Sequence, residues 1–269
     1  MRIGIISDLH IDRDTKRTFD DYVIVLSQEV RRRKVKLLLV AGDISNDCRL
    51  SYHFIKALKE KLDMEVLFVP GNHDYWQTNN DVSTIEVHDY FKSQPECLIE
   101  RPYIINDSWA VVGHIGWYDY SYADARFDQQ KLASGKFKGS TWQDKHYMDW
   151  QLDDQSVSKA FAEAVQRDFE HIGDRQIILL THIVTHKKFT VPLPHRIFDF
   201  YNAYIGTSDF NDLYKNYPVR YSIMGHVHFR KTAVEQGITY ICSCLGYTRQ
   251  WHSNHIQREI ADALYTIDI

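Results

Sequence analysis

The sequence predicts an α/β fold with a parallel sheet, because apolar runs and amphipathic helical stretches alternate along its first third. Residues 3–6, 36–41 and 64–70 are short apolar runs bounded by turn residues, which is typical of buried strands. Between them, apolar residues recur every three to four positions within 19–30 and 50–62, which predicts two helices. This βαβαβ order implies parallel strands joined by right-handed crossovers.

The remainder of the chain continues the alternation and ends in a part that reads as β structure. We expect further helices at 82–91 and 157–169, the second with Asp153 or Asp154 as its N-cap. Further strands are expected at 109–115, 176–181, 220–224, 232–235, 238–242 and 263–269.

Two stretches show neither the hydrophobic spacing of a helix nor that of a strand. Residues 117–152 mix Tyr, Trp, Lys and Gly and are interpreted as a cap or insert. Residues 183–216 form a long irregular loop that contains two prolines. No repeat or linker divides the chain, so we expect residues 1–269 to form one domain with these insertions.

Composition narrows the class of function. At 269 residues, 44% hydrophobic and 25% charged, the chain has ordinary globular values and can bury a sizeable core. A net charge of −4 does not favour a nucleic-acid partner, although it leaves a local groove open. No apolar stretch approaches a membrane span, so we expect no membrane partner. The four cysteines show neither zinc-finger spacing nor the density of a disulfide framework, which favours a cytoplasmic location.

Five polar clusters follow apolar runs and carry the chemistry of this chain. They are Asp8-Leu9-His10, Gly42-Asp43, Gly71-Asn72-His73-Asp74, Thr181-His182 and Gly225-His226-Val227-His228. In open α/β sheets the carboxyl ends of the strands converge on one crevice, where ligands bind. Asp-x-His, Gly-Asp or a lone His is a weak signal alone, whereas Gly71-Asn72-His73-Asp74 and Gly225-His226-Val227-His228 are more specific. Their joint occurrence after buried strands indicates a metal site.

Here the chain resembles the calcineurin-like metallophosphoesterase superfamily. The ordered pattern of that superfamily is D-x-H, G-D, G-N-H-[DE], a lone His and G-H-x-H, and every element is present from Asp8 to His228. The resemblance implies a four-layer α/β/β/α sandwich of two mixed β-sheets flanked by helices. It also implies two divalent metal ions, which mixed imidazole and oxygen ligands restrict to Mn, Fe, Zn, Ni or Co.

The resemblance also implies a role for each matching residue. Asp8, His10 and His228 would hold the first metal, Asn72, His182 and His226 the second, and Asp43 would bridge both. A metal-bridging hydroxide would attack phosphorus, and His73 would assist the leaving group. The protein Ser/Thr phosphatase branch has an Asp and an Arg where this chain has Asn46 and Asp47. Asp74 or Asp47 is a candidate substitute for the missing carboxylate that orients His73, and a phosphoprotein phosphatase is not favoured.

The substrate is specified less well than the metals. Tyr118, in an aromatic stretch after a strand, could line a pocket, and His186 and His195, in the loop after His182, could touch a phosphate. The expected partner is a small phosphorylated substrate, either a monoester or a diester, and the oligomeric state is open. The alternatives are a nuclease or cyclic-nucleotide phosphodiesterase of the same superfamily and, from another class, a non-catalytic protein-binding scaffold. A scaffold would usually lack several ligands that this chain keeps.

Overall fold

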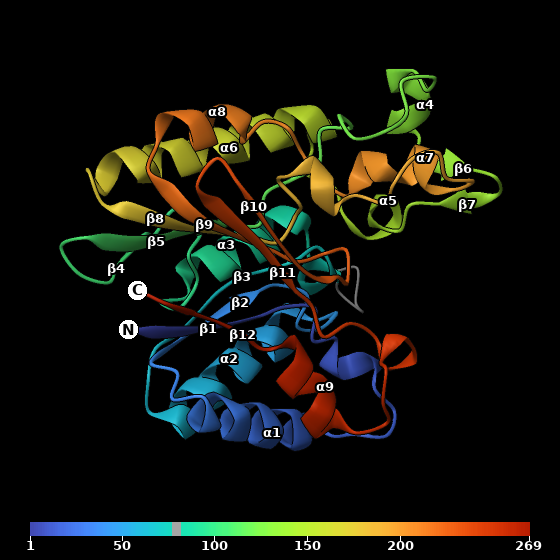
Figure 1. The fold of residues 1–269 in the computed structure, drawn as a ribbon. Coiled ribbons are helices and arrows are strands. Elements are labelled where there is room, and N and C mark those ends of the chain that lie inside the picture. The colour runs from blue at the N-terminus through green and yellow to red at the C-terminus, as the bar shows by residue number, and fades with distance from the viewer. Residues whose placement is uncertain (77–81) are drawn as a thin grey trace.

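The computed structural model describes residues 1–76 and 82–269 and consists of two main β-sheets packed face to face, with helices on both outer faces (Figure 1). This arrangement confirms the predicted four-layer α/β fold. Both termini lie at the same end of the molecule, where β1 and the last strand run side by side (Figure 1).

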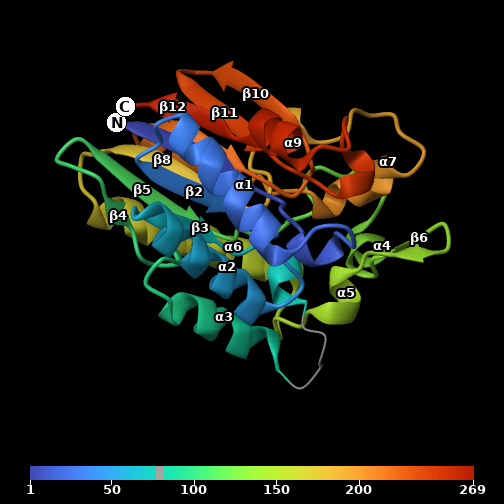
Figure 2. The same cartoon turned by 90° about the horizontal axis from the view of Figure 1, so that it is seen from below.

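The first sheet contains the predicted βαβαβ unit and has the strand order β12-β1-β2-β3. Its strands are β1 (Arg2–Ile6), β2 (Leu37–Ala41), β3 (Val66–Val69) and β12 (Tyr265–Asp268). The first three are parallel, whereas β12 returns antiparallel to β1. The outer face is covered by α1 (Phe19–Arg32), α2 (Cys48–Leu62) and α9 (Ile256–Ala263) (Figure 1). Alongside α2 lies α3 (Thr84–Ser93) (Figure 2).

The second sheet has six strands in the order β10-β11-β9-β8-β5-β4. They are β4 (Tyr103–Ile104), β5 (Trp109–His114), β8 (Gln176–Thr181), β9 (Val219–Met224), β10 (Arg230–Glu235) and β11 (Ile238–Ser243). The four central strands are parallel, and the edge strands β4 and β10 are antiparallel to their neighbours. The outer face is covered by α6 (Asp154–His171) and α8 (Asn211–Asn216) (Figure 1).

The main strands are apolar on both faces because each sheet is covered on both sides. Ile5 and Leu39 of the first sheet pack with Ile178 and Leu180 of the second, so one hydrophobic layer lies between the sheets. The alternate residues of the first sheet, Val40 among them, face the helices. The uninterrupted apolar runs of the sequence therefore follow from burial on both sides.

Residues 117–152, which we call the accessory segment, leave the sheets and form small elements at one end of the molecule (Figures 1 and 2). These are α4 (Gln129–Ala133), the hairpin strands β6 (Lys136–Phe137) and β7 (Ser140–Thr141), and α5 (Asp144–Tyr147). They lie beside α7 (Phe198–Tyr201) of the loop after β8, where the Tyr201 hydroxyl donates to the carbonyls of Phe137 and Ser140. Two segments that lack a sequence period thus pack against each other.

The main predicted strands and helices are observed, but the sequence did not predict β4, or α7 and α8 within the expected irregular loop at 183–216. Residues 176–181 form a strand with the predicted bounds, and Asp153 is the N-cap of α6, accepting from the Ser156 amide. The expectation of only β structure after residue 219 is wrong, because α9 precedes β12. Among the described residues, no helix has both the length and the apolar character required to cross a membrane.

Candidate metal centre

The seven predicted metal ligands lie at the carboxyl ends of five strands, where the two sheets meet. Asp8 and His10 follow β1, Asp43 follows β2, Asn72 follows β3, His182 follows β8, and His226 and His228 follow β9. Backbone hydrogen bonds join the sheets at this point, since Ser7 donates to the Ser243 carbonyl at 3.0 Å and accepts from the Leu245 amide at 2.9 Å. The topology therefore gathers these distant side chains in one place.

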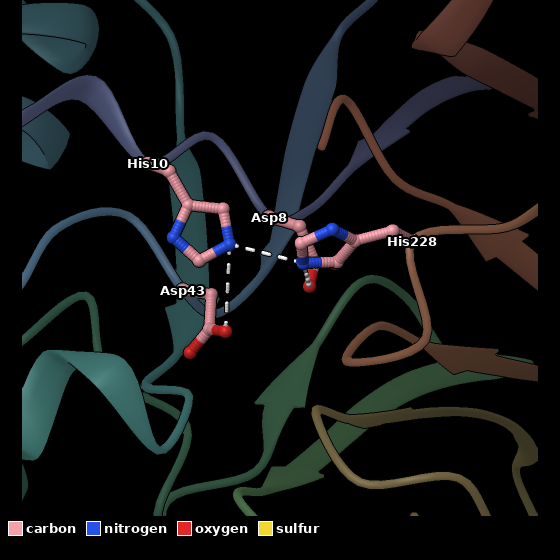
Figure 3. Close-up of side chains that lie close together, drawn as sticks. All are labelled: Asp8, His10, Asp43 and His228. Atoms are coloured by element: carbon pink, nitrogen blue, oxygen red, sulfur yellow. Dashed lines mark hydrogen bonds and ion pairs between the residues drawn. The ribbon is translucent and has the colours of Figure 1, made fainter. Parts of the chain in front are cut away.

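The first group of ligands comprises Asp8, His10, Asp43 and His228, whose candidate ligand atoms all lie within 4.8 Å of one another (Figure 3). The Nε2 atoms of His10 and His228 are 3.1 Å apart. Asp43 Oδ2 lies 3.7 Å from His10 Nε2, and Asp8 Oδ1 lies 3.4 Å from His228 Nε2. These imidazoles and carboxylates converge on a common point.

The second group comprises Asp43, His182 and His226, and it shares Asp43 with the first. Asp43 Oδ1 is 3.3 Å from His182 Nε2, which is 3.3 Å from His226 Nδ1. Asn72 joins this group through Oδ1, which lies 3.0 Å from both of these imidazole nitrogens. One carboxylate therefore presents one oxygen to each group, an arrangement that would allow it to bridge two ions.

The backbone at these ligands is strained. Five of them adopt left-handed conformations, with φ values from 44° to 71°: Asp8, His10, Asp43, His226 and His228. Non-glycine residues adopt this conformation at a cost that surrounding structure must offset, and such residues cluster at functional sites. Gly42 also has a positive φ of 81°, and a Cβ there would lie 2.4 Å from the Gly71 nitrogen. The glycines before the polar clusters therefore permit close approach of the loops after β2 and β3.

The charge distribution fits divalent cations. Burial lowers the pKa of His226 to about 3 and that of His10 well below its usual range, which favours the neutral form that binds metals. Burial opposes charge on Asp43 as well, but its contact with His182 holds the pKa of Asp43 well below its usual range. The same contact outweighs burial at His182 and raises the pKa of His182 to about 10. The buried carboxylate thus requires a positive charge beside it, which a divalent ion supplies.

A second layer of contacts orients the ligands. His182 Nδ1 faces the Ala41 carbonyl at 2.8 Å, and His226 Nε2 faces the Tyr204 carbonyl at 3.1 Å. His228 Nδ1 lies 2.7 Å from Gln250 Oε1. The Asn72 amide donates from Nδ2 to Asp144 Oδ1 at 2.8 Å. Each of these ligands therefore has its metal-facing atom set by a contact on its other side.

His73 lies beside the ligands and faces the cavity. Its Nδ1 is 2.9 Å from the side-chain amide of Asn46, which is best oriented with its nitrogen toward His73. In that orientation the Asn46 oxygen accepts from Arg13 Nη2 at 2.6 Å and Nε at 3.2 Å. Because Asn46 donates to Nδ1, the neutral ring carries its proton on Nε2, 3.3 Å from the Tyr247 hydroxyl.

The suggestion that Asp74 or Asp47 orients His73 is therefore wrong. Asp47 caps α2 by accepting from the Leu50 amide at 2.8 Å. Asp74 accepts from the loop that carries Asp43, including the Asp43 amide at 2.8 Å. Asn46 stands where the phosphatase branch has its orienting carboxylate, and its side-chain amide contacts His73 Nδ1. As a neutral amide it adds no charge beside His73.

A cavity of about 1000 Å³ opens onto the centre. Its described lining combines metal-facing groups with aromatic walls: Asp43, Asn72, His73, His226, His228, Trp76, Trp142, Tyr147, Phe198, Tyr201 and Tyr247. Arg13 and Arg249 add positive charge to it. Several walls come from the accessory segment and the loop after β8, so these irregular segments shape the space above the metal centre.

The three residues predicted to bind substrate lie elsewhere, outside the described lining of this cavity. Tyr118 is fully buried and stacks on Trp117, with its hydroxyl 3.5 Å from Asp144 Oδ2. His186 packs against Tyr240, with their ring centroids 4.2 Å apart. His195 Nδ1 accepts a hydrogen bond from the backbone amide of Phe198 at the start of α7.

Sequence reasoning missed the cavity walls and the orienting residues. Trp142, Tyr147 and Asp144 lie in a stretch without periodicity, so no pattern marked them. Arg13 lies three residues after His10, and this short spacing was the available signal that it would reach the same site.

Comparison with known proteins agrees with the fold and with a metal-dependent phosphoesterase family. The sequence profile of a family described as calcineurin-like phosphoesterase matches residues 1–230. A curated relative, the acyl-carrier-protein phosphodiesterase PptH of Mycobacterium tuberculosis, is 23% identical over 234 residues, which are 80% of this chain and 70% of PptH.

Solved structures share the architecture. The phosphopantetheinyl hydrolase PptH from Mycobacterium tuberculosis superposes with a TM-score of 0.77 at 19% identity, covering 98% of this chain and 95% of that one. A dimetal phosphatase from Danio rerio superposes with a TM-score of 0.52 at 15% identity, covering 90% and 86% of the two chains. At these identities the similarity concerns the fold.

Proposed function

Because this chain belongs to the calcineurin-like phosphoesterase family, a family of two-metal hydrolases of phosphoester bonds, we propose that it cleaves a phosphodiester joining a pantetheine-like arm to a carrier protein. The enzyme class and the two divalent metals follow from the family and from the two ligand groups. The substrate is the proposed part. We base the proposed substrate on the name of PptH, which describes that protein as an acyl-carrier-protein phosphodiesterase.

The shape of the cavity is the observation that carries this proposal. A volume of about 1000 Å³ lies at the upper end of ordinary ligand pockets and would be largely unfilled by a small monoester. Its aromatic walls suit a flexible, mostly uncharged arm, while Arg13 and Arg249 supply charge that attracts a phosphate. Asp43 and Asn72 belong to the lining of this space, so the phosphorus would lie beside them.

We assign the residues as follows. Asp8, His10 and His228 hold the first metal, Asn72, His182 and His226 hold the second, and Asp43 holds both. When bound, the ions activate water as a nucleophile and stabilise charge on the phosphoryl oxygens. His73 would donate a hydrogen bond from Nε2 to the departing oxygen and so stabilise its charge, because Asn46 occupies Nδ1 and Nε2 faces Tyr247 of the cavity lining. Arg13 fixes Asn46 from the opposite side.

The choice of metal and the cellular location are also proposals. Manganese suits the mixture of imidazole, carboxylate and amide donors. Cys97, Cys242 and Cys244 are buried thiols, which fits the reducing cytoplasm that we propose as the location.

Mass spectrometry of a carrier protein tests the substrate. The chain, loaded with Mn²⁺, is incubated with a carrier protein bearing its phosphopantetheine arm, and with bis-p-nitrophenyl phosphate, p-nitrophenyl phosphate, a cyclic nucleotide and single-stranded DNA. We expect release of the arm with its phosphate, which a chelator abolishes. Cleavage of a nucleotide with an untouched carrier protein would favour the nuclease or cyclic-nucleotide alternative, and no turnover of any ester would favour a scaffold.

A further inference from the structure

The second metal site depends on an amide that has two different ends. An asparagine can bind a cation only through its oxygen, and its NH₂ group would repel the cation if the amide were turned around. The Asn72 oxygen does face His182 Nε2 and His226 Nδ1, each at 3.0 Å. Something on the opposite side must therefore hold the NH₂ group away from the metal.

The acceptor on that side is Asp144, the first residue of α5 in the accessory segment (Figure 2). Its Oδ1 accepts from Asn72 Nδ2 at 2.8 Å and from the Trp76 indole at 2.8 Å. Its Oδ2 accepts from the Trp142 indole at 2.8 Å. The residue is 2% exposed, so these bonds form away from bulk water, where hydrogen bonds to a carboxylate are strong.

We propose that Asp144 is a positioning residue for the second metal ion, which makes the accessory segment a structural part of the metal centre. The inference rests on the proposed assignment of Asn72 as a ligand of that ion. The carboxylate presents acceptors alone, so it binds the NH₂ end of Asn72 and rejects the oxygen end. The amide is thereby held in the one orientation that offers its oxygen to the metal.

The same carboxylate connects the metal centre to the substrate cavity. Trp76 and Trp142, its two indole donors, both line that cavity. The Trp142 ring also stacks on Tyr204, whose carbonyl faces His226 Nε2 at 3.1 Å. The accessory segment therefore contacts Asn72 directly and reaches His226 only through Tyr204, on which Trp142 stacks.

The first ion has different support. The group formed by Asp8, His10 and His228 lies against the strand ends of the sheets, and His228 Nδ1 is held by Gln250 Oε1 at 2.7 Å. The described contacts of Asp144 reach Asn72 but none of these three residues. A defect at Asp144 should therefore weaken one metal site selectively.

Asp144→Asn is the direct test. Its side-chain oxygen can replace only one carboxylate oxygen, so an NH₂ group must face either Asn72 and Trp76 or Trp142, all of which are donors. Metal affinities are measured by calorimetric Mn²⁺ titration and metal content by elemental analysis after dialysis. We expect the first ion to bind as in the wild type and the second about 10–100-fold more weakly, which is the usual effect of removing an outer-shell partner.

Asp154→Asn is the matched control. Asp154 is a buried carboxylate, 7% exposed, that accepts from the Trp117 indole at 2.9 Å and pairs with Lys145 of the accessory segment. Asp154 therefore also anchors the accessory segment, but its described contacts include no metal ligand. We expect this variant to bind both ions with wild-type affinity, even if its thermal unfolding temperature falls.

The outcomes separate the inference from its premise. Wild-type protein that binds fewer than two ions would refute the ligand scheme itself. If the wild type binds two ions, equal second-site affinities for it and for Asp144→Asn would overturn the role of Asp144. Equal losses in Asp144→Asn and Asp154→Asn would also overturn it, because the cause would be general loosening of the segment. Should Asp144→Asn fail to fold, Asp144→Glu decides, with an intermediate second-site affinity expected and wild-type affinity contradicting the inference.

Discussion

Replacing Asp74 by Asn should destabilise the protein strongly, because this carboxylate ties together the two loops that carry Asp43 and Asn72. Asp74 is fully buried just after β3. Its Oδ2 accepts from the backbone amides of Asp43 at 2.8 Å and Gly71 at 2.7 Å. Its Oδ1 accepts from the amides of Ile44 and Ser45 and from the Ser51 hydroxyl, at 2.9, 3.0 and 2.5 Å.

The magnitude follows from these contacts. The asparagine oxygen is expected on the side with three donors, which leaves its NH₂ group facing the amides of Asp43 and Gly71. A buried donor without an acceptor costs about 1–3 kcal/mol, so two of them amount to about 2–6 kcal/mol. Ser51→Ala is the milder comparison, since losing one hydroxyl donor should cost about 0.5–1.5 kcal/mol.

Urea unfolding followed by fluorescence of the six tryptophans measures both variants, in chelator so that metal binding does not contribute. We expect Asp74→Asn to lose at least about 2 kcal/mol of unfolding free energy, against a typical total of about 5–15 kcal/mol. A loss below about 1 kcal/mol, or one equal to that of Ser51→Ala, would show that Asp74 does not hold these loops together.

Three further changes test the site and its surroundings. Asp43→Asn should abolish hydrolysis and weaken both metal ions together, so wild-type metal content in this variant would exclude a bridging role. His73→Ala should keep two ions yet turn over about 10²–10⁴-fold more slowly, and unchanged turnover would remove it from the mechanism. The hydrogen bond from Arg32 lowers the pKa of Glu29 in the folded protein. The ionised Glu29 therefore stabilises the fold at any pH above the pKa of a glutamate in the unfolded chain. This stabilisation is lost as the pH falls through the lower pKa of Glu29 in the folded protein. Glu29→Gln should therefore be less stable than the wild type at pH 7, and the difference should shrink on acidification; a constant difference would contradict this linkage.

The sequence was sufficient for the main strands and for the finding that the seven candidate ligands lie together. Residues 176–181 are apolar throughout because β8 is covered on both faces, and such runs are readily recognised. Each polar cluster comes directly after a strand of this kind, so knowing where the strand ends also locates the ligand. His182, which is unremarkable alone, becomes interpretable for this reason.

The failures share a physical cause. Helix α9 has Ile256, Ile260 and Ala263 at helical spacing, but its eight residues are too few to stand out within a region expected to be β. The accessory segment lacks a period because it is held by scattered aromatic side chains and by buried hydrogen bonds to Asp144 and Asp154, not by one regular apolar face. Such bonds join residues far apart in sequence and leave no local pattern.

The contrast between regular strands and the irregular accessory segment explains why the sequence indicates the catalytic class better than the substrate. The topology of the two sheets brings the candidate ligands at the strand ends together. The cavity walls Trp142 and Tyr147 belong to the segment whose structure the sequence does not reveal. Asp144 joins the two parts by binding Asn72 on one oxygen and Trp142 on the other. Substitutions that reshape the cavity through Trp142 should therefore also alter the second metal site, whereas those at Phe198, a lining residue without a described bond to Asp144, should alter substrate choice alone.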